Sequence, residues 1–523
     1  MRKHVWILLA AAALLGGACG SGSTSGSGSS APHSTVSVRL DGDWITLNPY
    51  ATSTINTVVV MSGIYDRLVA LSPDQKSVVP YLAKSFKVTP SSLTFEIRKG
   101  VTCSDGTPLG PSQVADSLRY MLTQVQVSQI LGPGPGSAHS ISSDDAAGTV
   151  TVNLAKPFSD AIYNFTNPHA AILCPGEINL IKQNVSDKAI GSGPYTIANA
   201  VHNDHMTLQP RSDWTWGPNG ESAKNPGFPS QLNLMVVGND TTVANELLTG
   251  QLNVAAVSGP DVTRLINNKS FIHTTFGGSY LSELAFNDNV ALMKDQKIRQ
   301  GIITAINTKD FMQADTGGFG VTSPSFLAPA AACYDAATAK LAHTPSVTDA
   351  QKILQSDGYT LDNGKLMKNG QQLSIRLLST SARFGQAPEY VSDTLTKVGI
   401  NVQLTNVDSA TYTSNILSGK YDVVTGFLSG GGPAPGNYIL YMTGPTNGHG
   451  GSNSGIDDPE VDQLVTAAFQ ATGSAQCPAW AKVQEKLIQN WDALPLDQQT
   501  KQYFTTGVKM DTGTWVWLDS LHR

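Results

Sequence analysis

The chain has 523 residues, of which 40% are hydrophobic and 14% charged, with 49 glycines and 28 prolines. This length is sufficient for two or three lobes, and the composition is typical of a loop-rich globular protein rather than a disordered chain or a coiled coil. The formal net charge is −6, and the sequence contains no long basic run. We therefore expect no nucleic-acid partner, because phosphate binding requires clustered positive charge.

The first residues follow the pattern of an export signal. Arg2 and Lys3 precede an apolar run over 5–15, and small residues then lead to Cys19. This order predicts a signal peptide over 1–18, whose apolar run is too short for a permanent membrane span. Cys19 resembles the lipidated cysteine of bacterial lipoproteins, although Gly16 stands where their motif usually has leucine. The alternative is a plain secretory signal with an incidental cysteine.

Residues 19–34 are rich in glycine and serine, so we expect a flexible tether with no core of its own. A tether after an acylated Cys19 would hold the folded part at the outer face of the cell membrane without inserting it. The lipid anchor is therefore the only membrane contact that we expect, and the location is extracytoplasmic.

Four cysteines remain, and an even number in an exported chain favours two disulfides over buried free thiols. Three pairings are possible. We favour Cys103–Cys174 and Cys333–Cys477, because each pair would then fall within one lobe. No C-x-x-C spacing occurs, so the cysteines do not indicate a zinc site.

Hydrophobic periodicity predicts strands and helices in alternation, which indicates a mixed α/β class. We expect strands at 36–40, 93–98, 149–154, 206–209, 232–237, 281–286, 373–378, 400–404, 421–427 and 502–518. We expect helices at 112–122 with Ser112 as N-cap, at 243–248 before Gly250, at 295–306, at 348–356 and at 388–398 before Gly399. The last strand could return to the first lobe.

Several segments resemble, in order, family 5 of the extracellular solute-binding proteins, the oligopeptide, dipeptide and nickel type. Segment 81–122 contains an LA-x-S pair, an LTF-x-I-R strand, a DGTPL turn and a V-x-x-S-L helix. The residues that carry these motifs are Leu82, Ala83, Ser85, Leu93, Phe95, Arg98, Asp105, Gly106, Val114, Ser117 and Leu118. Weaker similarities follow at 191–195 (GSGPY), 247–254, 295–307, 397–400 and 421–422. Most of these residues are explained by turns and core packing, so they indicate the fold rather than the solute site.

The resemblance implies a two-lobed fold like that of the type II periplasmic binding proteins, in the large peptide-binding form with an extra subdomain and a hinge. It implies lobe I over 35–279, with the subdomain at about 61–190, lobe II over 280–490, and a return to lobe I over 491–523. Closure of two such lobes would remove a solute from water and strengthen its hydrogen bonds.

The same resemblance implies a monomeric binding component of an ABC importer, which captures a peptide or peptide-like solute for the permease subunits and has no cofactor. Two alternatives stay open: a lipoprotein of this fold in envelope assembly or signalling, and a non-peptide ligand such as an oligosaccharide or metal chelate. An enzyme is not expected, since the sequence has no G-x-S-x-G, H-E-x-x-H or Walker motif. His202 and His205 lie between two predicted strands and favour a solvated hairpin tip over a metal site.

Peptide-binding relatives place an aspartate for the peptide's ammonium soon after the YD strand, but the corresponding loop 427–438 contains no carboxylate. A buried ammonium without a counter-charge would cost roughly 3–5 kcal/mol. We therefore expect a solute without a free amine, or another acid in that role. The side chains and backbone groups that we expect to contact the solute, each with loop packing or a solvated surface as the alternative, are Trp44, Tyr280, Arg383, Phe384, Phe427, Ser429, Gly431, Asn437 and Tyr438.

Overall fold

The computed structural model describes residues 35–51, 55–73, 77–124, 138–183, 188–329, 331–335, 337, 343–380, 384–430, 433–439, 456, 458–511 and 516–523. All of these belong to one contact unit, Ser34–Arg523. Within these ranges, every helix is too short or too polar to cross a membrane. The predicted signal peptide and tether, including Cys19, lie outside the described residues.

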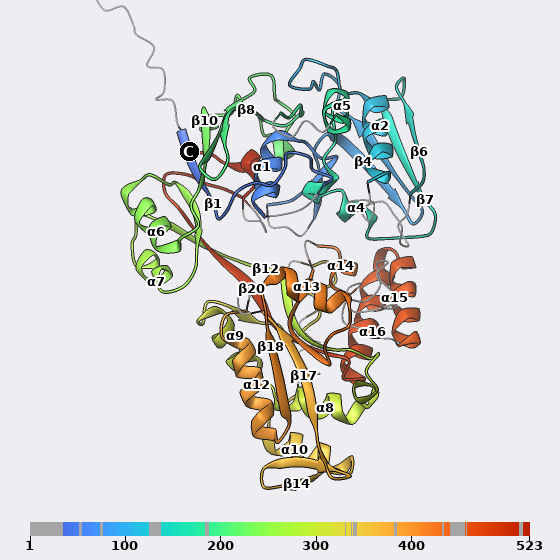
Figure 1. The fold of residues 1–523 in the computed structure, drawn as a ribbon. Coiled ribbons are helices and arrows are strands. Elements are labelled where there is room, and N and C mark those ends of the chain that lie inside the picture. The colour runs from blue at the N-terminus through green and yellow to red at the C-terminus, as the bar shows by residue number, and fades with distance from the viewer. Residues whose placement is uncertain are drawn as a thin grey trace, which may run out of the picture. The chain divides into compact units, whose positions relative to one another are not determined.

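An 11-stranded sheet organises this unit (Figure 1). In spatial order its strands are β18 (Asn401–Asn406), β17 (Ser374–Ser379), β19 (Val423–Gly430), β12 (Ile272–Phe286), β20 (Ala493–Thr505), β11 (Val254–Val257), β1 (Thr35–Leu40), β10 (Gln231–Val236), β9 (His205–Pro210) and β8 (Tyr195–Val201), while β13 (Val321–Thr322) pairs with β20.

Two long strands, β12 and β20, carry the chain from one half of this sheet to the other. Their antiparallel ladder joins residues 272–277 to 500–505, stops, and resumes with 281–285 opposite 493–498. The register therefore shifts between Gly277 and Leu281. Below, this interruption is called the ladder break.

The parallel strands on both sides end toward the ladder break. β11 runs antiparallel to β20, with Val257 opposite Gln502, and β1 is parallel to both β11 and β10. In the other half, β19 runs antiparallel to β12 until Gly430 lies opposite Tyr280, and β17 is parallel to β18 and β19. The carboxyl ends of both parallel sets are thus directed at the same place.

A second sheet is antiparallel and consists of β4 (Ala83–Thr89), β5 (Ser92–Ile97), β7 (Thr149–Leu154) and β6 (Ala138–Asp144). Leu93, Phe95 and Ile97 alternate inward along β5, as a half-buried strand requires. Helix α2 (Pro111–Leu122) buries Val114 and Leu118 and lies beside β6 and β7 in Figure 1.

The remaining strands form small ribbons: β2 (Val69–Leu71) with β3 (Val78–Pro80), and β14 (Thr360–Asp362), β15 (Lys365–Lys368) and β16 (Gln371–Gln372). The other helices are α1 (Ile55–Ile64), α4 (Ala161–Asn164), α5 (Pro175–Lys182), α6 (Asp240–Thr249), α7 (Asp261–Ile266), α8 (Gln296–Ala305), α9 (Thr308–Thr316), α10 (Val347–Ser356), α12 (Ala387–Val398), α13 (Ser409–Leu417), α14 (Gly436–Ile439), α15 (Pro459–Gln470) and α16 (Gln476–Gln489).

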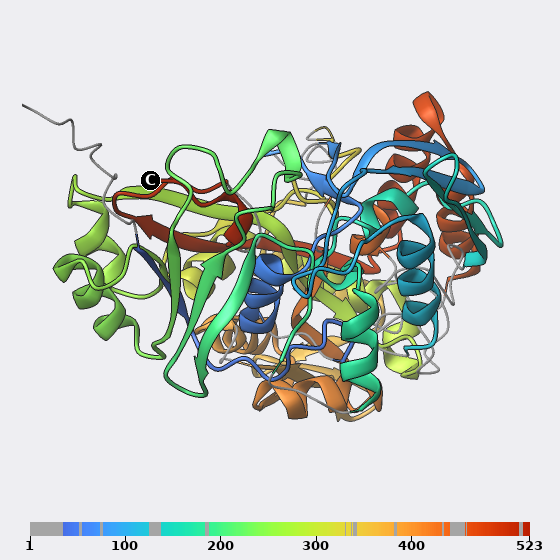
Figure 2. The same ribbon diagram turned by 90° about the horizontal axis from the view of Figure 1, so that it is seen from above.

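Short 3₁₀ turns are η1 (Pro168–Ala170), η2 (Pro218–Gly220), η3 (Ala291–Lys294), η5 (Gly473–Ala475) and η6 (Leu518–Ser520). In Figure 2 the pair α6–α7, in yellow-green, and the pair α15–α16, in orange-red, lie at opposite ends of the view. The α/β class and most predicted elements are confirmed, including the left-handed caps at Gly250 and Gly399.

Two local predictions are wrong. Helix α2 begins at Pro111 with Gly110 as its N-cap, because proline is well suited to the first helical position. Ser112 lies one residue further in and donates its amide and hydroxyl to Asp145 instead. The last strand is also displaced: β20 spans 493–505 rather than 502–518, and it stops just before the left-handed backbone of Gly507.

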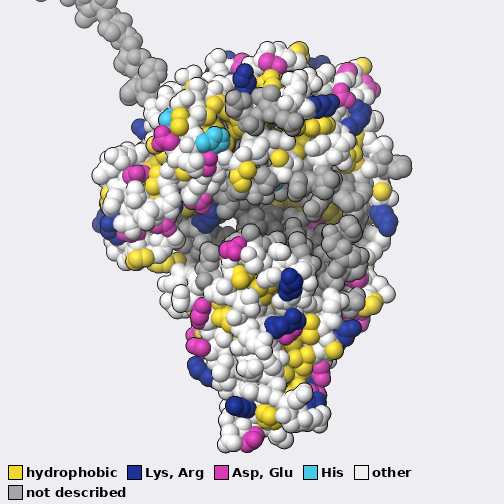
Figure 3. Space-filling view, in the orientation of Figure 1, with side chains coloured by type: hydrophobic (Ala, Val, Ile, Leu, Met, Phe, Trp, Pro, Cys, Tyr) yellow, Lys and Arg dark blue, Asp and Glu magenta, His cyan; other side chains and the backbone are white. Residues whose placement is uncertain are grey.

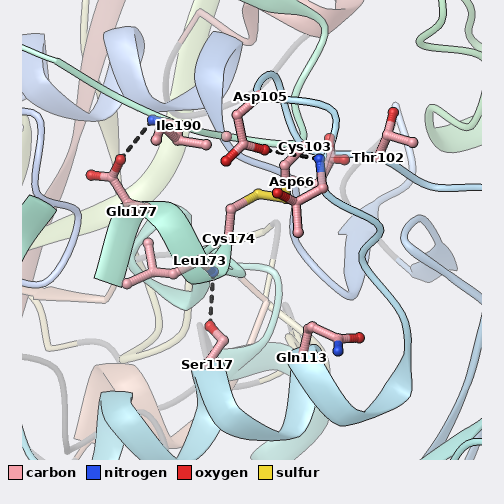
Figure 4. The surroundings of a disulfide bond; sticks show 12 residues. Asp66, Thr102, Cys103, Asp105, Gln113, Ser117, Leu173, Cys174, Glu177 and Ile190 are labelled. Atoms are coloured by element: carbon pink, nitrogen blue, oxygen red, sulfur yellow. Dashed lines mark hydrogen bonds between the residues drawn. A yellow bond between two sulfur atoms is a disulfide. The ribbon is translucent and has the colours of Figure 1, made fainter. Parts of the chain in front are cut away.

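Both disulfides join the pairs that we favoured, Cys103–Cys174 and Cys333–Cys477. The first is buried and ties the loop before α2 to the start of α5 (Figure 4). Next to it, Leu173 donates its amide to Ser117 on α2. The Ser117 of the family-like motif is therefore buried and hydrogen-bonded next to this disulfide.

Removing Cys103–Cys174 by a Cys103→Ser, Cys174→Ser double substitution should lower the free energy of unfolding by about 4 kcal/mol. The physical reason is that the bond closes a loop of 71 residues and so restricts the unfolded chain. Urea unfolding under non-reducing conditions measures the change. A double variant with the same unfolding midpoint as the parent would contradict the expectation.

Candidate functional site

The ladder break is the place where a ligand site is expected from the fold. In open α/β sheets, ligands bind outside the carboxyl ends of parallel strands. Here β1, β10 and β11 end toward the break from one half, and β17, β18 and β19 from the other. The loops that follow these strands carry most of the solute contacts that we predicted.

Trp44 follows β1 and is only 3% exposed. Its indole stacks on His202, with ring centroids 4.7 Å apart and planes inclined by 27°. His202 in turn lies 2.7 Å from Asp43 through Nδ1, so the β8–β9 hairpin covers Trp44. This is the packing arrangement that we gave as the alternative, and a solute contact by Trp44 stays a prediction.

His202 and His205 do sit at the turn of the β8–β9 hairpin. His205 contacts Asp204 and Asn199, each at 3.0 Å. Across the described part of the chain, no group of three or more His, Cys, Asp or Glu residues is arranged to hold a metal ion.

Three predicted contacts fall on two adjacent strands. In the β12–β19 ladder, Tyr280 lies opposite Gly430, Ser429 opposite Leu281, and Phe427 opposite Glu283. The structure therefore brings the backbones of Tyr280, Ser429 and Phe427 together at the ladder break. Their side chains lie outside the described part, as do the whole of Arg383 and Gly431.

The other three predicted residues are described. Phe384 is fully buried and lies against Tyr412, with ring centroids 6.5 Å apart, which is core packing. Asn437 and Tyr438 lie in α14, where Asn437 is half-buried and Tyr438 is buried. Their contacts with a solute stay predictions.

Helix α14 is held by a residue from a distant part of the chain, Asp160. The carboxylate of Asp160 accepts the amide of Gly436 at 2.8 Å and the side-chain amide of Gln476 at 2.9 Å. Burial raises the pKa of Asp160 to about 6, while these donors act in the opposite direction. Asp160 therefore positions the helix that carries Asn437 and Tyr438.

The contact around Asp160 is tightly packed. Ser159 donates its amide to the carbonyl of Phe469 at 3.0 Å. The ring centroids of Phe158 and Phe469 lie 4.8 Å apart. A Cβ on Gly436 would come within 2.5 Å of that ring, so only glycine fits there. The segment 158–160 thus fastens α14, α15 and α16 together.

Two buried carboxyl groups, Asp315 on α9 and Asp497 on β20, face one another beside the ladder break. Burial raises the pKa of both, and their mutual repulsion adds to this for Asp315. The hydroxyl of Ser282, opposite Asp497 in the ladder, acts against the rise in the pKa of Asp497. Because neighbouring carboxylates disfavour each other's ionisation, we expect the pair to share a proton.

Sequence reasoning missed Asp160, Asp315 and Asp497. Their roles depend on partners far away in the chain, and no local pattern marks them. On the face drawn in Figure 3, Lys and Arg side chains are scattered among acidic ones and form no continuous basic patch. This dispersal agrees with the absence of a basic run from the sequence.

The model of a protein family described as bacterial extracellular solute-binding proteins, family 5, middle, matches residues 77–450. A putative ABC transporter peptide-binding protein of Brucella ovis is 24% identical over 423 residues, which cover 79% of this chain and 77% of that protein.

Solved structures are similar over nearly the whole chain. A substrate-binding protein of Microbacterium hydrocarbonoxydans, in complex with 4-hydroxybenzoate hydrazide, is 27% identical with a TM-score of 0.74 and covers 94% of this chain and 99% of its own. NikA of Brucella suis, in complex with Fe(III)-EDTA, is 20% identical with a TM-score of 0.79, and the match covers 93% of this chain and 99% of NikA.

Asp160→Ala should lower the free energy of unfolding by about 2 kcal/mol, because it leaves the buried amide of Gly436 without an acceptor and removes one of the two acceptors of the Gln476 side-chain amide. Urea unfolding measures the loss. The matched control is Asp116→Ala, which removes an exposed ion pair with Arg119 and should cost less than about 0.5 kcal/mol. Equal effects of the two substitutions would refute a fastening role for Asp160.

The pair Asp315–Asp497 should make stability fall as the pH rises. The pKa of each carboxyl group is raised, to about 8 for Asp315 and about 6 for Asp497, so the folded state keeps a proton that the unfolded state loses at about pH 4. The stability that this proton contributes is therefore lost as the pH rises through the pKa values of the folded pair. In Asp315→Asn an amide replaces the shared proton as donor, so the decline between pH 5 and pH 9 should be shallower than in the parent. Unfolding free energies across this range test this, and parallel curves would show that no proton is shared.

Proposed function

We propose, because this chain belongs to family 5 of the bacterial extracellular solute-binding proteins, that it captures a small organic solute, a peptide or peptide-like compound, for an ABC importer. Members of this family bind solutes and are not enzymes. The observation that carries the proposal is the ladder break, at which the carboxyl ends of two parallel strand sets meet.

Hinged closure follows from the same feature. Lobe I over 35–279, lobe II over 280–490 and the return over 491–523 would be joined by β12 and β20, which both change register near the proposed boundary. A break in the hydrogen-bonded ladder is where such a connection can bend with least loss of bonding. Closure there would bring the loops after β1 and β19 onto the solute.

The relatives support a range of organic solutes. The Brucella ovis relative is named for peptides, and the Microbacterium hydrocarbonoxydans structure holds an aromatic acyl hydrazide. Loop 427–438 of this chain contains no carboxylate to pair with an ammonium group. We therefore favour solutes whose recognition does not depend on a free amine.

Membrane attachment is a separate part of the proposal. We propose cleavage after residue 18 and lipidation of Cys19, with 19–34 as the tether that leaves the folded part at the outer face of the membrane. Cys19→Ser should then release the protein from the membrane fraction and abolish its labelling by radioactive palmitate in the producing bacterium. Undiminished labelling of the variant would exclude Cys19 as the acylation site.

The binding function is tested with the purified protein, a library of dipeptides and the small-molecule extract of the producing cells. Native mass spectrometry should show one solute bound per protein molecule, and calorimetry should give a saturable isotherm with no conversion of the solute. Chemical turnover of the solute, or the absence of any retained compound, would overturn the proposed function.

A further inference from the structure

The side chain of Lys501 places a positive charge at the ladder break. Lys501 of β20 is opposite Phe276, next to the last pair of the first ladder segment, and β11 ends one position earlier with Val257 opposite Gln502. Lys501 therefore lies just beyond the carboxyl end of β11. Within the described part of the chain, its ammonium group makes no ion pair and no hydrogen bond, and part of its surface is exposed.

Its charged neighbours do not neutralise Lys501. Desolvation by burial lowers its pKa, the negative charge of Asp41 acts against this, and the positive charge of Arg39 reinforces it. Arg39 is already committed: its guanidinium lies 2.7 Å from Asp240 and donates to the carbonyls of Val237 at 2.9 Å and Ala256 at 2.5 Å. Of these two cations at the ladder break, Lys501 is therefore the one whose N–H groups have no acceptor among the described residues.

A structural explanation does not account for this arrangement. Lysines that stabilise a fold either pair with a carboxylate or extend the ammonium group fully into water. A partly desolvated, unpaired ammonium lowers stability, and such groups at strand ends in a cleft are typical of binding sites. The position at the carboxyl ends of β11 and β1 is where a ligand is expected.

We propose that Lys501 binds the anionic end of the solute, a carboxylate or a similar oxyanion, and thereby makes this protein select anionic over neutral compounds. The inference rests on the proposed function, since it concerns the same site. It also agrees with the sequence of loop 427–438, which contains no carboxylate. The solute's anion replaces the water that Lys501 loses on burial.

The test compares the parent with Lys501→Met, Lys501→Arg and the exposed control Lys509→Met. The probes are the dipeptide library with free carboxyl ends, the same library amidated at those ends, and 4-hydroxybenzoate against its hydrazide. Calorimetry and native mass spectrometry should show at least a tenfold preference of the parent for the anionic members. Lys501→Met should lose that preference, Lys501→Arg should retain most of it, and Lys509→Met should match the parent.

Failure of the inference and failure of the proposed function are distinguishable. If the parent binds solutes but prefers the neutral members, or if Lys501→Met keeps the parent's preference, the inference is wrong and the solute-binding function stands. If the parent binds no probe and retains nothing from the cell extract, both are wrong.

A stability measurement separates a binding role from a structural one. Lys501→Met should be at least as stable as the parent without solute at pH 7, because it removes a desolvated charge. A lowered pKa means that the folded protein loses this proton before the unfolded chain does, so the parent should gain stability relative to Lys501→Met as the pH rises toward 10. A variant that is destabilised at pH 7, with a difference that shrinks as the pH rises, would show a structural ion pair and overturn the inference.

Discussion

The interruption of the β12–β20 ladder is the constraint on which the rest of the molecule depends. On each side of it, antiparallel pairing fixes β20 against β12, with one further register shift between Ser282 and Glu283, and through them the neighbouring strands β11 and β19. Because side chains alternate with a period of two, a slip of one residue in either segment would invert every side chain of that strand. The register of the flanking segments is therefore fixed, and the bending that we propose is confined to the break.

The charged groups near the break differ in whether they have partners. Arg39 is satisfied by Asp240 and two carbonyls, and it joins the ends of β1, β10 and β11. Asp315 and Asp497 both have raised pKa values, which favours a proton shared between them. These groups hold the scaffold, while Lys501 has no such partner among the described residues. This difference is the reason why we propose Lys501, and not Arg39, as the residue that binds the solute.

Much of the fold could be read from the sequence, because it is encoded locally. The alternation of Leu93, Phe95 and Ile97 predicts a half-buried strand, and Gly250 and Gly399 predict helix ends by their freedom to adopt left-handed backbone. Prediction failed where two local signals competed, as when Pro111 took the start of α2 from Ser112, and in β20, whose polar residues 497–502 hide a central strand.

The candidate site was less predictable, because it is built from contacts over long distances in the chain. Trp44 was expected on a loop, but only the fold shows that the β8–β9 hairpin covers it. Asp160 and Gly436 are 276 positions apart, and nothing near Asp160 indicates its partner. Lys501 was missed for the same reason, since its environment depends on where β11 ends.

The bond between Cys333 and Cys477 ties together two segments that lie next to α14. Ala332, the neighbour of Cys333, donates its amide to the carbonyl of Pro433 at 2.8 Å, three residues before α14 begins. Cys477 lies in the first turn of α16, next to the Gln476 that bonds Asp160. Reduction of Cys333–Cys477 would remove this covalent tie and leave hydrogen bonds alone to hold Pro433 and the first turn of α16.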